Sequence, residues 1–397
     1  MAKSTDNPMI LFDARLITET PSGIGVYAQE MLSRIPRLAP DLRFRALFRS
    51  AERRDAVLAG AQLDGLGNFS AEIIPYGPFS PKSQLKLPAL IRRSGASVFH
   101  TPNFIMPYFA FPRNGRCACV ANIHDIIPLV VENYAPNSRT SKFKGVYREC
   151  IRQSVLRSRA VITGSEAAKN DIVRELRLSP ETASRCRVIF DGATPSGSAD
   201  AHTPVKDAAD LTTPRLLIYV GRMDPYKNVP LLVGALEKIR AKCPFPVTLK
   251  VIGPKDPRYP EAERRAVELG LGNAVDFTGF VSAEELATCY RTADLLTHPS
   301  RYEGFGLQLI EAMSAGTPVL CTDGGSQPEV AGDAAVVVPA GDEDAFAAAA
   351  TDILLSPERQ AALRHAGALR AKDFTWDATA HKTLALYREL IDGGNAK

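Results

Sequence analysis

Paired cysteines are missing from this sequence. Its seven cysteines are scattered between positions 117 and 321, with no C-x-x-C pair and no regular framework spacing. This pattern argues against a disulfide scaffold and predicts reduced core residues in a cytoplasmic protein. The N-terminal stretch MAKSTDNPMILFDARL lacks the apolar region of a signal peptide. No apolar run is long enough to cross a bilayer, so we expect any membrane contact to be peripheral.

Acidic residues are scarce in the first half of the chain. Residues 1–200 contain 27 lysines and arginines against 18 acidic residues, whereas the remainder contains 21 against 26. A basic first half predicts an acidic or membrane-associated partner there, although unevenly distributed solvated charge explains the same counts. At 397 residues the chain exceeds one ordinary core, so we expect two domains.

The order of apolar runs predicts an α/β fold. Short, β-rich apolar runs alternate with amphipathic helical patterns along the whole chain, which is typical of parallel sheets covered on both faces. Residues 193–214 are rich in Pro, Ser, Ala and Asp and lack periodicity, so we expect a linker there. We therefore expect two αβα domains of similar size, with ligands bound beyond the carboxyl ends of their strands.

The stretch SRYEGFGLQLIEAMSAGTPV carries two glutamates, Glu303 and Glu311. A helix predicted from about Phe305 to Ala315 places them roughly 10–12 Å apart along its axis. This separation exceeds that of a glycosidase pair and is too long for one metal ion. An elongated ligand lying along the helix could meet both carboxylates, with Gly304 and Gly306 letting backbone N–H groups approach it. Taken singly, the two residues are also compatible with one solvated glutamate and one that faces a helix.

Two cations follow an apolar strand in the stretch YVGRMDPYKNV. Arg222 and Lys227 lie in the loop before a helix predicted to start near Val229. Arginine offers a planar fork for phosphate oxygens and lysine adds a point charge, so the pair suits a diphosphate and its departure. An ordinary charged surface loop remains the alternative.

Two further strand ends carry polar or glycine residues. Gly23 and Gly25 form a G-x-G turn whose amides could face a phosphate or sugar, but the third glycine of the dinucleotide fingerprint is absent. His124 and Asp125 end an apolar strand, where they could contact sugar hydroxyls or assist proton transfer. A plain tight turn and a loop histidine with a capping aspartate explain the same residues.

The stretch KFKGVYRECIRQSVLRSRAV predicts a helix with a basic face. Phe143, Val146 and Ile151 belong to an apolar stripe that we expect to face the core. The lysines and arginines lie off this stripe, with Glu149 as the only acid. The basic face is compatible with a solvated surface or with contact to anionic lipid headgroups.

Together these motifs resemble the large family 4 of retaining GT-B glycosyltransferases. The element from Glu303 to Glu311 is similar to the family's E-x7-E motif, and Arg222 with Lys227 matches its diphosphate-binding pair. The turn at Gly23–Gly25 corresponds to its glycine loop, and FTWDATAHKTLALYREL is similar to its C-terminal helix. The resemblance implies two Rossmann-like domains facing across a cleft. Residues 1–195 would bind the acceptor, 210–375 the nucleotide sugar, and 376–397 would form a helix crossing back to the N-terminal domain.

The resemblance also implies residue roles. Glu311 would hold the ribose hydroxyls and Glu303 would lie near the transferred sugar. The remaining donor contacts would come from backbone amides of the glycine-rich loop, from the base-binding segment and from cleft-lining positions: Gly304, Phe305, Gly306, Leu307, Phe280, Val281, Asp125 and Ser165. The resemblance implies no metal ion, because Arg222 and Lys227 replace it and no D-x-D motif occurs in a suitable context.

We therefore expect a cytoplasmic, metal-independent, retaining hexosyltransferase that uses Glu303, Arg222, Lys227 and His124 in catalysis. The HDIIPL stretch is similar to bacterial mannosyltransferases, which suggests GDP-mannose as the nucleotide-sugar donor and no further cofactor. The acceptor would be a lipid-linked glycan, reached through peripheral contact with the inner face of the cell membrane; no nucleic-acid partner is expected. The alternatives are another donor such as UDP-glucose, a phosphorylase-like activity, or a catalytically silent nucleotide-sugar-binding protein.

Overall fold

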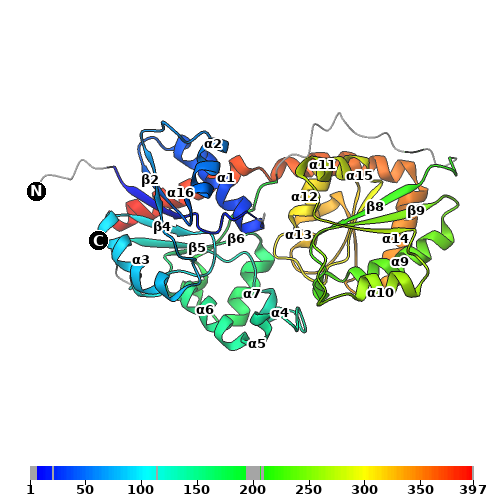
Figure 1. Ribbon diagram of the computed structural model, residues 1–397, viewed down its shortest axis with the longest axis horizontal. Coiled ribbons are helices and arrows are strands. Elements are labelled where there is room, and N and C mark those ends of the chain that lie inside the picture. The colour runs from blue at the N-terminus through cyan, green and yellow to red at the C-terminus, as the bar shows by residue number, and fades with distance from the viewer. Residues whose placement is uncertain (1–6, 20–21, 113–114, 194–205, 207–209, 396–397) are drawn as a thin grey trace, which may run out of the picture.

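The computed structural model describes residues 7–19, 22–112, 115–193, 206 and 210–395. Two domains lie side by side, each with a parallel sheet covered by helices (Figure 1). This confirms the predicted fold class. Most of the predicted linker at 193–214 lies outside the described residues.

The N-terminal sheet has the strand order β3-β2-β1-β4-β5-β6-β7, and each pair is parallel. Its strands are β1 (Met9–Asp13), β2 (Arg43–Phe48), β3 (Phe69–Ile73), β4 (Val98–Thr101), β5 (Ala118–Asn122), β6 (Ala160–Thr163) and β7 (Cys186–Val188). The helices of this domain are α1 (Gly23–Leu38), α2 (Ala51–Gly60), α3 (Pro81–Ser94), η1 (Tyr108–Ala110), α4 (Ile127–Val130), α5 (Arg139–Lys142), α6 (Lys144–Arg157), α7 (Glu166–Leu176) and α8 (Pro180–Ala183).

The C-terminal sheet has the strand order β10-β9-β8-β11-β12-β13 and is also parallel. Its strands are β8 (Arg215–Val220), β9 (Val247–Ile252), β10 (Val275–Gly279), β11 (Leu295–His298), β12 (Val319–Thr322) and β13 (Val336–Val338). The helices that follow along the chain are η3 (Pro225–Lys227), α9 (Val229–Lys242), α10 (Glu261–Glu268), α11 (Ala283–Thr292), α12 (Leu307–Ser314), α13 (Gln327–Ala331), η4 (Gly332–Ala334), α14 (Glu343–Leu355), α15 (Pro357–Arg370), η5 (Ala371–Asp373) and α16 (Trp376–Asn395).

Local chemistry explains several of these boundaries. Strands β1 and β5 are buried along their whole length, as expected for central strands of a covered parallel sheet. Ser22, Ser165 and Ser282 are the N-caps of helices α1, α7 and α11, and each side chain accepts a bond from a backbone N–H of the first turn. Serine at these positions therefore sets where three of the helices start.

The C-terminal helix α16 packs on the N-terminal domain. Trp376 and Tyr387 belong to the buried cluster that also holds Tyr27 of α1 and Phe12 of β1. In Figure 1 the red helix α16 runs back to the left-hand domain. The predicted return of the C-terminal helix is therefore correct.

The apolar stripe of the predicted 142–161 helix does not bury uniformly. Ile151 is fully buried, but Phe143 and Val146 have exposed fractions of 64% and 62%. The expectation that the whole stripe faces the core was therefore wrong at its N-terminal end. The physical reason is that the helix is interrupted: Phe143 is the C-cap of α5 and the N-cap of α6, so it lies outside the regular stripe of one continuous helix.

All seven cysteines are free; Cys117 and Cys150 are partly buried and the other five are buried. No helix in the described part of the chain is long and apolar enough to span a bilayer.

Candidate active site

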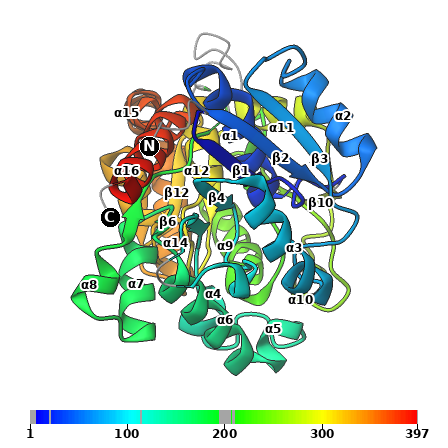
Figure 2. The same cartoon turned by 90° about the vertical axis from the view of Figure 1, so that its left-hand side faces the viewer.

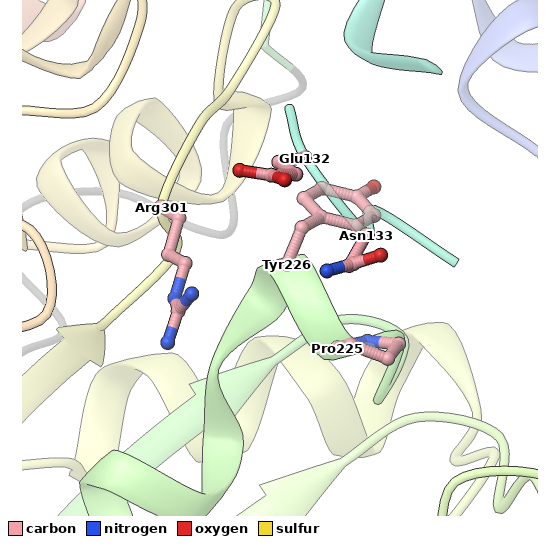
Figure 3. A pocket seen from close by; sticks show the side chains of 5 residues that line it. All are labelled: Glu132, Asn133, Pro225, Tyr226 and Arg301. Atoms are coloured by element: carbon pink, nitrogen blue, oxygen red, sulfur yellow. The ribbon is translucent and has the colours of Figure 1, made fainter. Parts of the chain in front are cut away.

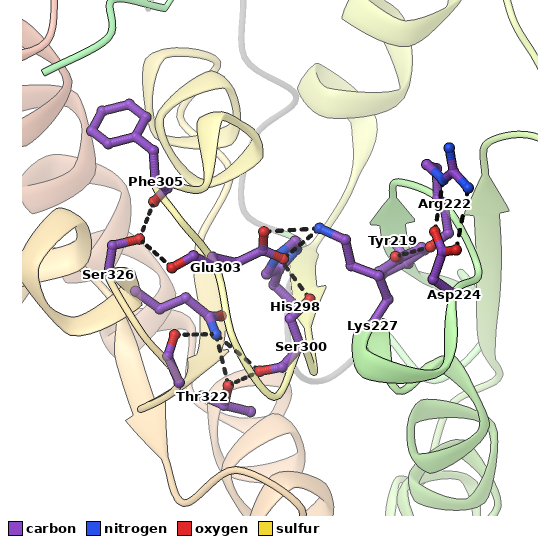
Figure 4. Close-up of polar contacts among 12 residues, drawn as sticks. Tyr219, Arg222, Asp224, Lys227, His298, Ser300, Glu303, Phe305, Thr322 and Ser326 are labelled. Atoms are coloured by element: carbon purple, nitrogen blue, oxygen red, sulfur yellow. Dashed lines mark hydrogen bonds and ion pairs between the residues drawn. The ribbon is translucent and has the colours of Figure 1, made fainter. Parts of the chain in front are cut away.

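A buried ion pair lies where strands β8 and β11 end. Lys227 closes the short helix η3 after β8, and its Nζ lies 2.6 Å and 2.8 Å from the two carboxylate oxygens of Glu303. Glu303 lies in the loop after β11, and both side chains are almost fully buried. Figure 4 shows Lys227 reaching across from its own loop to Glu303. The structure thus brings together two predicted catalytic residues that are 76 positions apart.

His298, the last residue of β11, completes this cluster. Its Nε2 lies 2.8 Å from Oε1 of Glu303, and its ring stacks on Tyr219 of β8 with 6.0 Å between ring centroids. A carboxylate only accepts hydrogen bonds, so Nε2 carries the proton. Glu303 therefore has two donors, one of which remains if Lys227 turns towards a ligand.

The charges of this cluster stabilise one another. Burial alone would raise the pKa of Glu303, but the charge of Lys227 and the hydrogen bond from His298 outweigh it and hold this pKa well below its ordinary value. Burial alone would lower the pKa of Lys227, but Glu303 outweighs it and the pKa is raised. Both groups are therefore charged at neutral pH.

Arg222 lies in the same loop after β8 as Lys227 and is held by Asp224. Its Nε donates to Asp224 Oδ2 at 2.6 Å and its Nη2 donates to Oδ1 at 3.2 Å. The Arg222 side chain is 61% exposed while that of Asp224 is 7% exposed. The hydroxyl of Tyr219 donates to the Arg222 backbone carbonyl at 2.5 Å. Arg222 is thus a cation open to an incoming anion but fixed at its base.

The glycine-rich loop is positioned by its own backbone. The carbonyl oxygen of Glu303 accepts bonds from the N–H and the hydroxyl of Ser326, and Glu303 forms an isolated bridge with Gly325. Gly306 has a φ of +94°, a conformation that favours glycine, and helix α12 begins after it. The predicted helix start at Phe305 was therefore two residues early.

Glu311 lies in α12 and points to α11. Its Oε2 accepts a hydrogen bond from the Tyr290 hydroxyl at 2.8 Å. Burial raises the pKa of Glu311, and the Tyr290 bond only partly offsets this effect. Glu311 is therefore partly buried, and one of its two carboxylate oxygens already accepts a hydrogen bond.

The loop after β11 also touches the N-terminal domain. The hydroxyl of Ser165, at the end of β6, donates to the backbone carbonyl of Gly304 at 2.7 Å. A Cβ placed on Gly304 would lie 2.6 Å from Cβ of Asp125 and 2.8 Å from the carbonyl oxygen of His124. Only glycine allows this approach, so the predicted N-terminal and C-terminal site residues meet at Gly304.

His124 lies between the carboxylate of Asp191 and the backbone carbonyl of Pro102. Its Nδ1 lies 3.6 Å from Asp191 Oδ2, and its Nε2 lies 3.3 Å from the carbonyl oxygen of Pro102. Burial alone would lower the pKa of His124, but the hydrogen bond and charge of Asp191 outweigh it and raise this pKa. Both ring nitrogens face acceptors, so the geometry favours the protonated ring.

The glycine pair lies inside α1 rather than in a turn before it. Gly23 is the first helical residue, and the N–H of Gly25 donates to the side chain of Ser22 at 3.1 Å. A Cβ on Gly25 would lie 3.3 Å from the carbonyl oxygen of Leu16, whereas one on Gly23 would meet nothing within 4 Å. Close packing against Leu16 thus explains a glycine at position 25. Position 23, at the start of α1, has room for a larger side chain.

The remaining predicted donor residues differ in exposure. Phe280 is 66% exposed and Val281 is partly buried, both in the loop between β10 and α11. The side chain of Phe305 is buried against Phe190 and Phe374. Its backbone, like that of Leu307 at the start of α12, is what remains for ligand contact.

A pocket of about 220 Å³ opens at Tyr226, between the two domains. Pro225, Tyr226 and Arg301 line it from the C-terminal domain, and Glu132 and Asn133 from the N-terminal domain (Figure 3). The rings of Tyr226 and Tyr134 lie 5.8 Å apart across this boundary. Lys227 Nζ lies 5.0 Å from the centroid of the Tyr226 ring, so this ring separates the pocket from the buried ion pair. Among the described residues, no group of three or more His, Cys, Asp or Glu side chains is arranged to hold a metal ion.

Sequence reasoning missed His298, Asp224, Tyr290 and Asp191. A signal existed for His298, because it is the last residue of an apolar strand, and His124 follows the end of another. Asp224 is two residues from Arg222, but its role depends on burial that the sequence does not display. Tyr290 and Asp191 are far along the chain from their partners and offered no local signal.

Two protein families match the chain. "Glycosyl transferases group 1" matches residues 205–370, and "Glycosyltransferase Family 4" matches residues 21–195. O-antigen chain mannosyltransferase B of Escherichia coli is 26% identical over 96% of this chain and 100% of that protein. D-inositol 3-phosphate glycosyltransferase of Segniliparus rotundus is 34% identical over 45% of this chain and 41% of that protein.

The fold matches solved structures of the same architecture. The crystal structure of Anabaena Alr3699/HepE in complex with UDP and glucose has a TM-score of 0.72 at 17% identity, over 96% of this chain and 100% of that one. Together with the two family matches, the parallel sheets and the returning α16, this identifies the chain as a glycosyltransferase of family 4 with the GT-B fold.

Proposed function

We propose that this glycosyltransferase moves mannose from GDP-mannose to a hydroxyl group of a glycan acceptor, with retention of configuration at the anomeric carbon. The observation that carries the proposal is the buried Lys227–Glu303–His298 cluster beside Arg222 at the ends of β8 and β11. The full-length similarity to an O-antigen mannosyltransferase supports mannose and a glycan acceptor.

In the proposed reaction, the bond between the anomeric carbon and the diphosphate breaks and negative charge builds on the departing oxygen. Arg222 and Lys227 are the two cations that would stabilise this charge. Lys227 would exchange Glu303 for a phosphate oxygen, and His298 would keep Glu303 hydrogen-bonded during that exchange. Glu303 would then face the sugar, and Glu311 the ribose hydroxyls.

The acceptor oxygen would bond to the anomeric carbon on the face that the diphosphate leaves. Its proton would pass to the departing phosphate oxygen, so no side chain has to accept it. His124 fits this scheme as a charged neighbour rather than as a base, because both of its ring nitrogens face acceptors. We also propose that the acceptor is lipid-linked, which would require peripheral contact with the cytoplasmic face of a membrane.

The donor is tested by a thermal-shift panel of GDP, GDP-mannose, UDP and UDP-glucose. A ligand at 100 times its dissociation constant adds about 2.7 kcal/mol of stability, so selective stabilisation by the guanine compounds is expected. Stabilisation by the uracil compounds alone would replace GDP-mannose with another donor. Glu311→Gln is the matched variant, because it should weaken the shift without changing the fold.

A second acceptor class is favoured by one comparison. The D-inositol 3-phosphate glycosyltransferase relative is 34% identical over its aligned part, so a phosphorylated inositol is the alternative acceptor. The two are separated by incubating the enzyme and its preferred donor with mannose-containing oligosaccharides or with inositol phosphate, and by identifying the product. Transfer to inositol phosphate alone would contradict a glycan acceptor.

A further inference from the structure

Large apolar side chains are exposed on one side of the N-terminal domain. Phe79, Leu85, Phe109, Phe143 and Val146 have exposed fractions between 62% and 76%. They lie before α3, on α3, on η1, and at the junction of α5 and α6. We call these five residues the α3–α6 surface.

These residues belong to one continuous region, although the chain separates them. The ring of Phe104 lies 6.5 Å from that of Phe79 and 5.2 Å from that of Tyr147, which follows Val146 in the sequence. Gln84 Nε2 donates to the carbonyl oxygen of Met106 at 2.9 Å.

Two more bonds extend this region. Gln84 Oε1 accepts from the N–H of Tyr108 at 3.0 Å, and the Tyr108 hydroxyl donates to the carbonyl oxygen of Cys150 in α6 at 3.3 Å. These contacts connect α3, η1 and α6. Figure 2, which faces the N-terminal domain, shows α3, α5 and α6 on the same side of it.

The same region carries an excess of positive charge along the sequence, and its second basic run lies between Glu132 and Glu149. Residues 73–124 contain six lysines and arginines and no Asp or Glu, and residues 133–148 contain four and none. Lys82, Lys86, Lys142 and Lys144 are exposed, and none of them forms an ion pair within the described part of the chain. These cations are therefore available to a partner.

We infer that the α3–α6 surface binds the anionic surface of a lipid bilayer. Lipid headgroups would pair with the four lysines while the aromatic and aliphatic side chains enter the boundary between headgroups and acyl chains. A soluble polyanion would neutralise the lysines but leave the apolar side chains in water. An uncharged apolar partner would leave the lysines unpaired. Only a partner that is both anionic and apolar satisfies the whole surface.

The α3–α6 surface is connected along the chain to the pocket between the two domains. The chain that lines the pocket at Glu132 and Asn133 continues directly through α5 to Phe143. Asn137, between them, donates its N–H to the Tyr259 hydroxyl of the C-terminal domain at 3.3 Å. A bilayer on the α3–α6 surface would thus lie beside the entrance to the cleft. This step rests on the proposed lipid-linked acceptor, whereas the binding itself does not.

The test is sedimentation of the full chain with vesicles of phosphatidylcholine alone or of phosphatidylcholine mixed with phosphatidylglycerol. Binding to the mixed vesicles and little binding to the neutral ones is expected. Each lysine near an anionic surface contributes a factor of about five to the partition coefficient, so the double variant Lys142→Gln, Lys144→Gln should lower it about 25-fold. The double variant Phe143→Ser, Val146→Ser should also lower it, by about tenfold or more.

Matched controls come from the C-terminal domain. Lys242→Gln with Lys372→Gln removes two exposed lysines, and Val267→Ser removes an apolar side chain that is 77% exposed. These variants should bind like the unmodified protein. Equal binding to both vesicle types, or equal losses in the test and control variants, would overturn the inference, as would competition by inorganic phosphate at the same concentration as lipid phosphate.

Failure of the proposed function gives a different pattern. If the donor assignment is wrong, the thermal-shift panel changes while vesicle binding persists. If the α3–α6 surface does not bind anionic bilayers, vesicle binding is absent or unselective. Nucleotide-dependent stabilisation and transfer to a water-soluble acceptor then persist in every surface variant.

Discussion

Two regions of the molecule differ in how their lysines are placed: the buried ion pair after β8 and β11, and the exposed α3–α6 surface. In the C-terminal domain, Lys227 is buried and bound to Glu303. In the N-terminal domain, Lys142 and Lys144 are exposed, and neither forms an ion pair with a described residue. A buried charge needs a partner because its desolvation costs several kcal/mol, whereas an exposed charge stays hydrated and needs none. The difference separates a site built for one small anion from a surface suited to an extended one.

Buried histidines show a second contrast. His298 in the C-terminal domain donates to the carboxylate of Glu303. His100 in the N-terminal domain lies between neutral groups, Asn122 and the hydroxyl of Tyr387 on α16. Burial lowers the pKa of His100 to about 4. One histidine thus belongs to a charged cluster and the other to a neutral one that anchors the C-terminal helix.

The largest expected effect is at Lys227. Lys227→Ala removes a cation from the departing diphosphate, so turnover should fall about 10²–10³-fold, or about 3–4 kcal/mol. Steady-state rates with the preferred donor measure this effect. Lys242→Ala, an exposed lysine of α9, is the control and should leave the rate unchanged. Equal rates in both variants would remove the distinction between buried and exposed cations.

Acid should separate the two histidine environments. The pKa of His100 is lowered from 6.5 to about 4. The unfolded chain therefore takes up its proton first as the pH falls, and the free energy of unfolding drops by about 3 kcal/mol between these values. Because the pKa of Glu303 is lowered, its stabilising contribution persists above its ordinary value of 4.5 and is lost only below it.

This prediction is measured as the pH dependence of thermal unfolding for His100→Gln. The slope between pH 6.5 and pH 4 should become flatter in this variant. His381→Gln, which removes an exposed histidine of α16, should keep the original slope. An unchanged slope in His100→Gln would show that another group titrates there.

Glu311 should give a smaller effect, of about 2 kcal/mol. If its carboxylate accepts bonds from the ribose, Glu311→Ala should raise the donor KM about 10–100-fold with little change in turnover. Tyr290→Phe, which removes the donor to Oε2, should raise the KM less. A fall in turnover at constant KM would contradict the ribose assignment.

The smallest expected effect is at Glu329, which connects the domains. Its carboxylate accepts the backbone N–H groups of Glu166 and Ala167, at 2.9 Å and 3.1 Å, and thereby caps α7. Glu329→Ala should cost about 1 kcal/mol, visible as a shift of about 1 °C in calorimetry. Glu268→Ala, an exposed acid of α10, is the control. Identical unfolding profiles would mean that this contact contributes no measurable stability.

Local patterns predicted much of the fold. Apolar runs fell on central strands such as β1 and β5, and α9 begins at Val229 as predicted. The start of α12 was misplaced, because the left-handed conformation of Gly306 ends the loop two residues later than the pattern indicated. Periodicity also could not reveal that the helix is interrupted at Phe143. Nor could it reveal that Phe143 is exposed, because burial depends on which other segments pack against it.

The sequence by itself determined the alternation of strands and helices, the strand-end positions of Arg222, Lys227 and Glu303, and the family motifs, because these depend on neighbours along the chain. Only the tertiary structure decided that Lys227 pairs with Glu303, that His298 donates to Glu303 and Asp224 holds Arg222, and that Phe143 and Val146 stay exposed. The physical reason is that an ion pair depends on distance and burial across segments far apart in the chain, and the sequence records neither quantity.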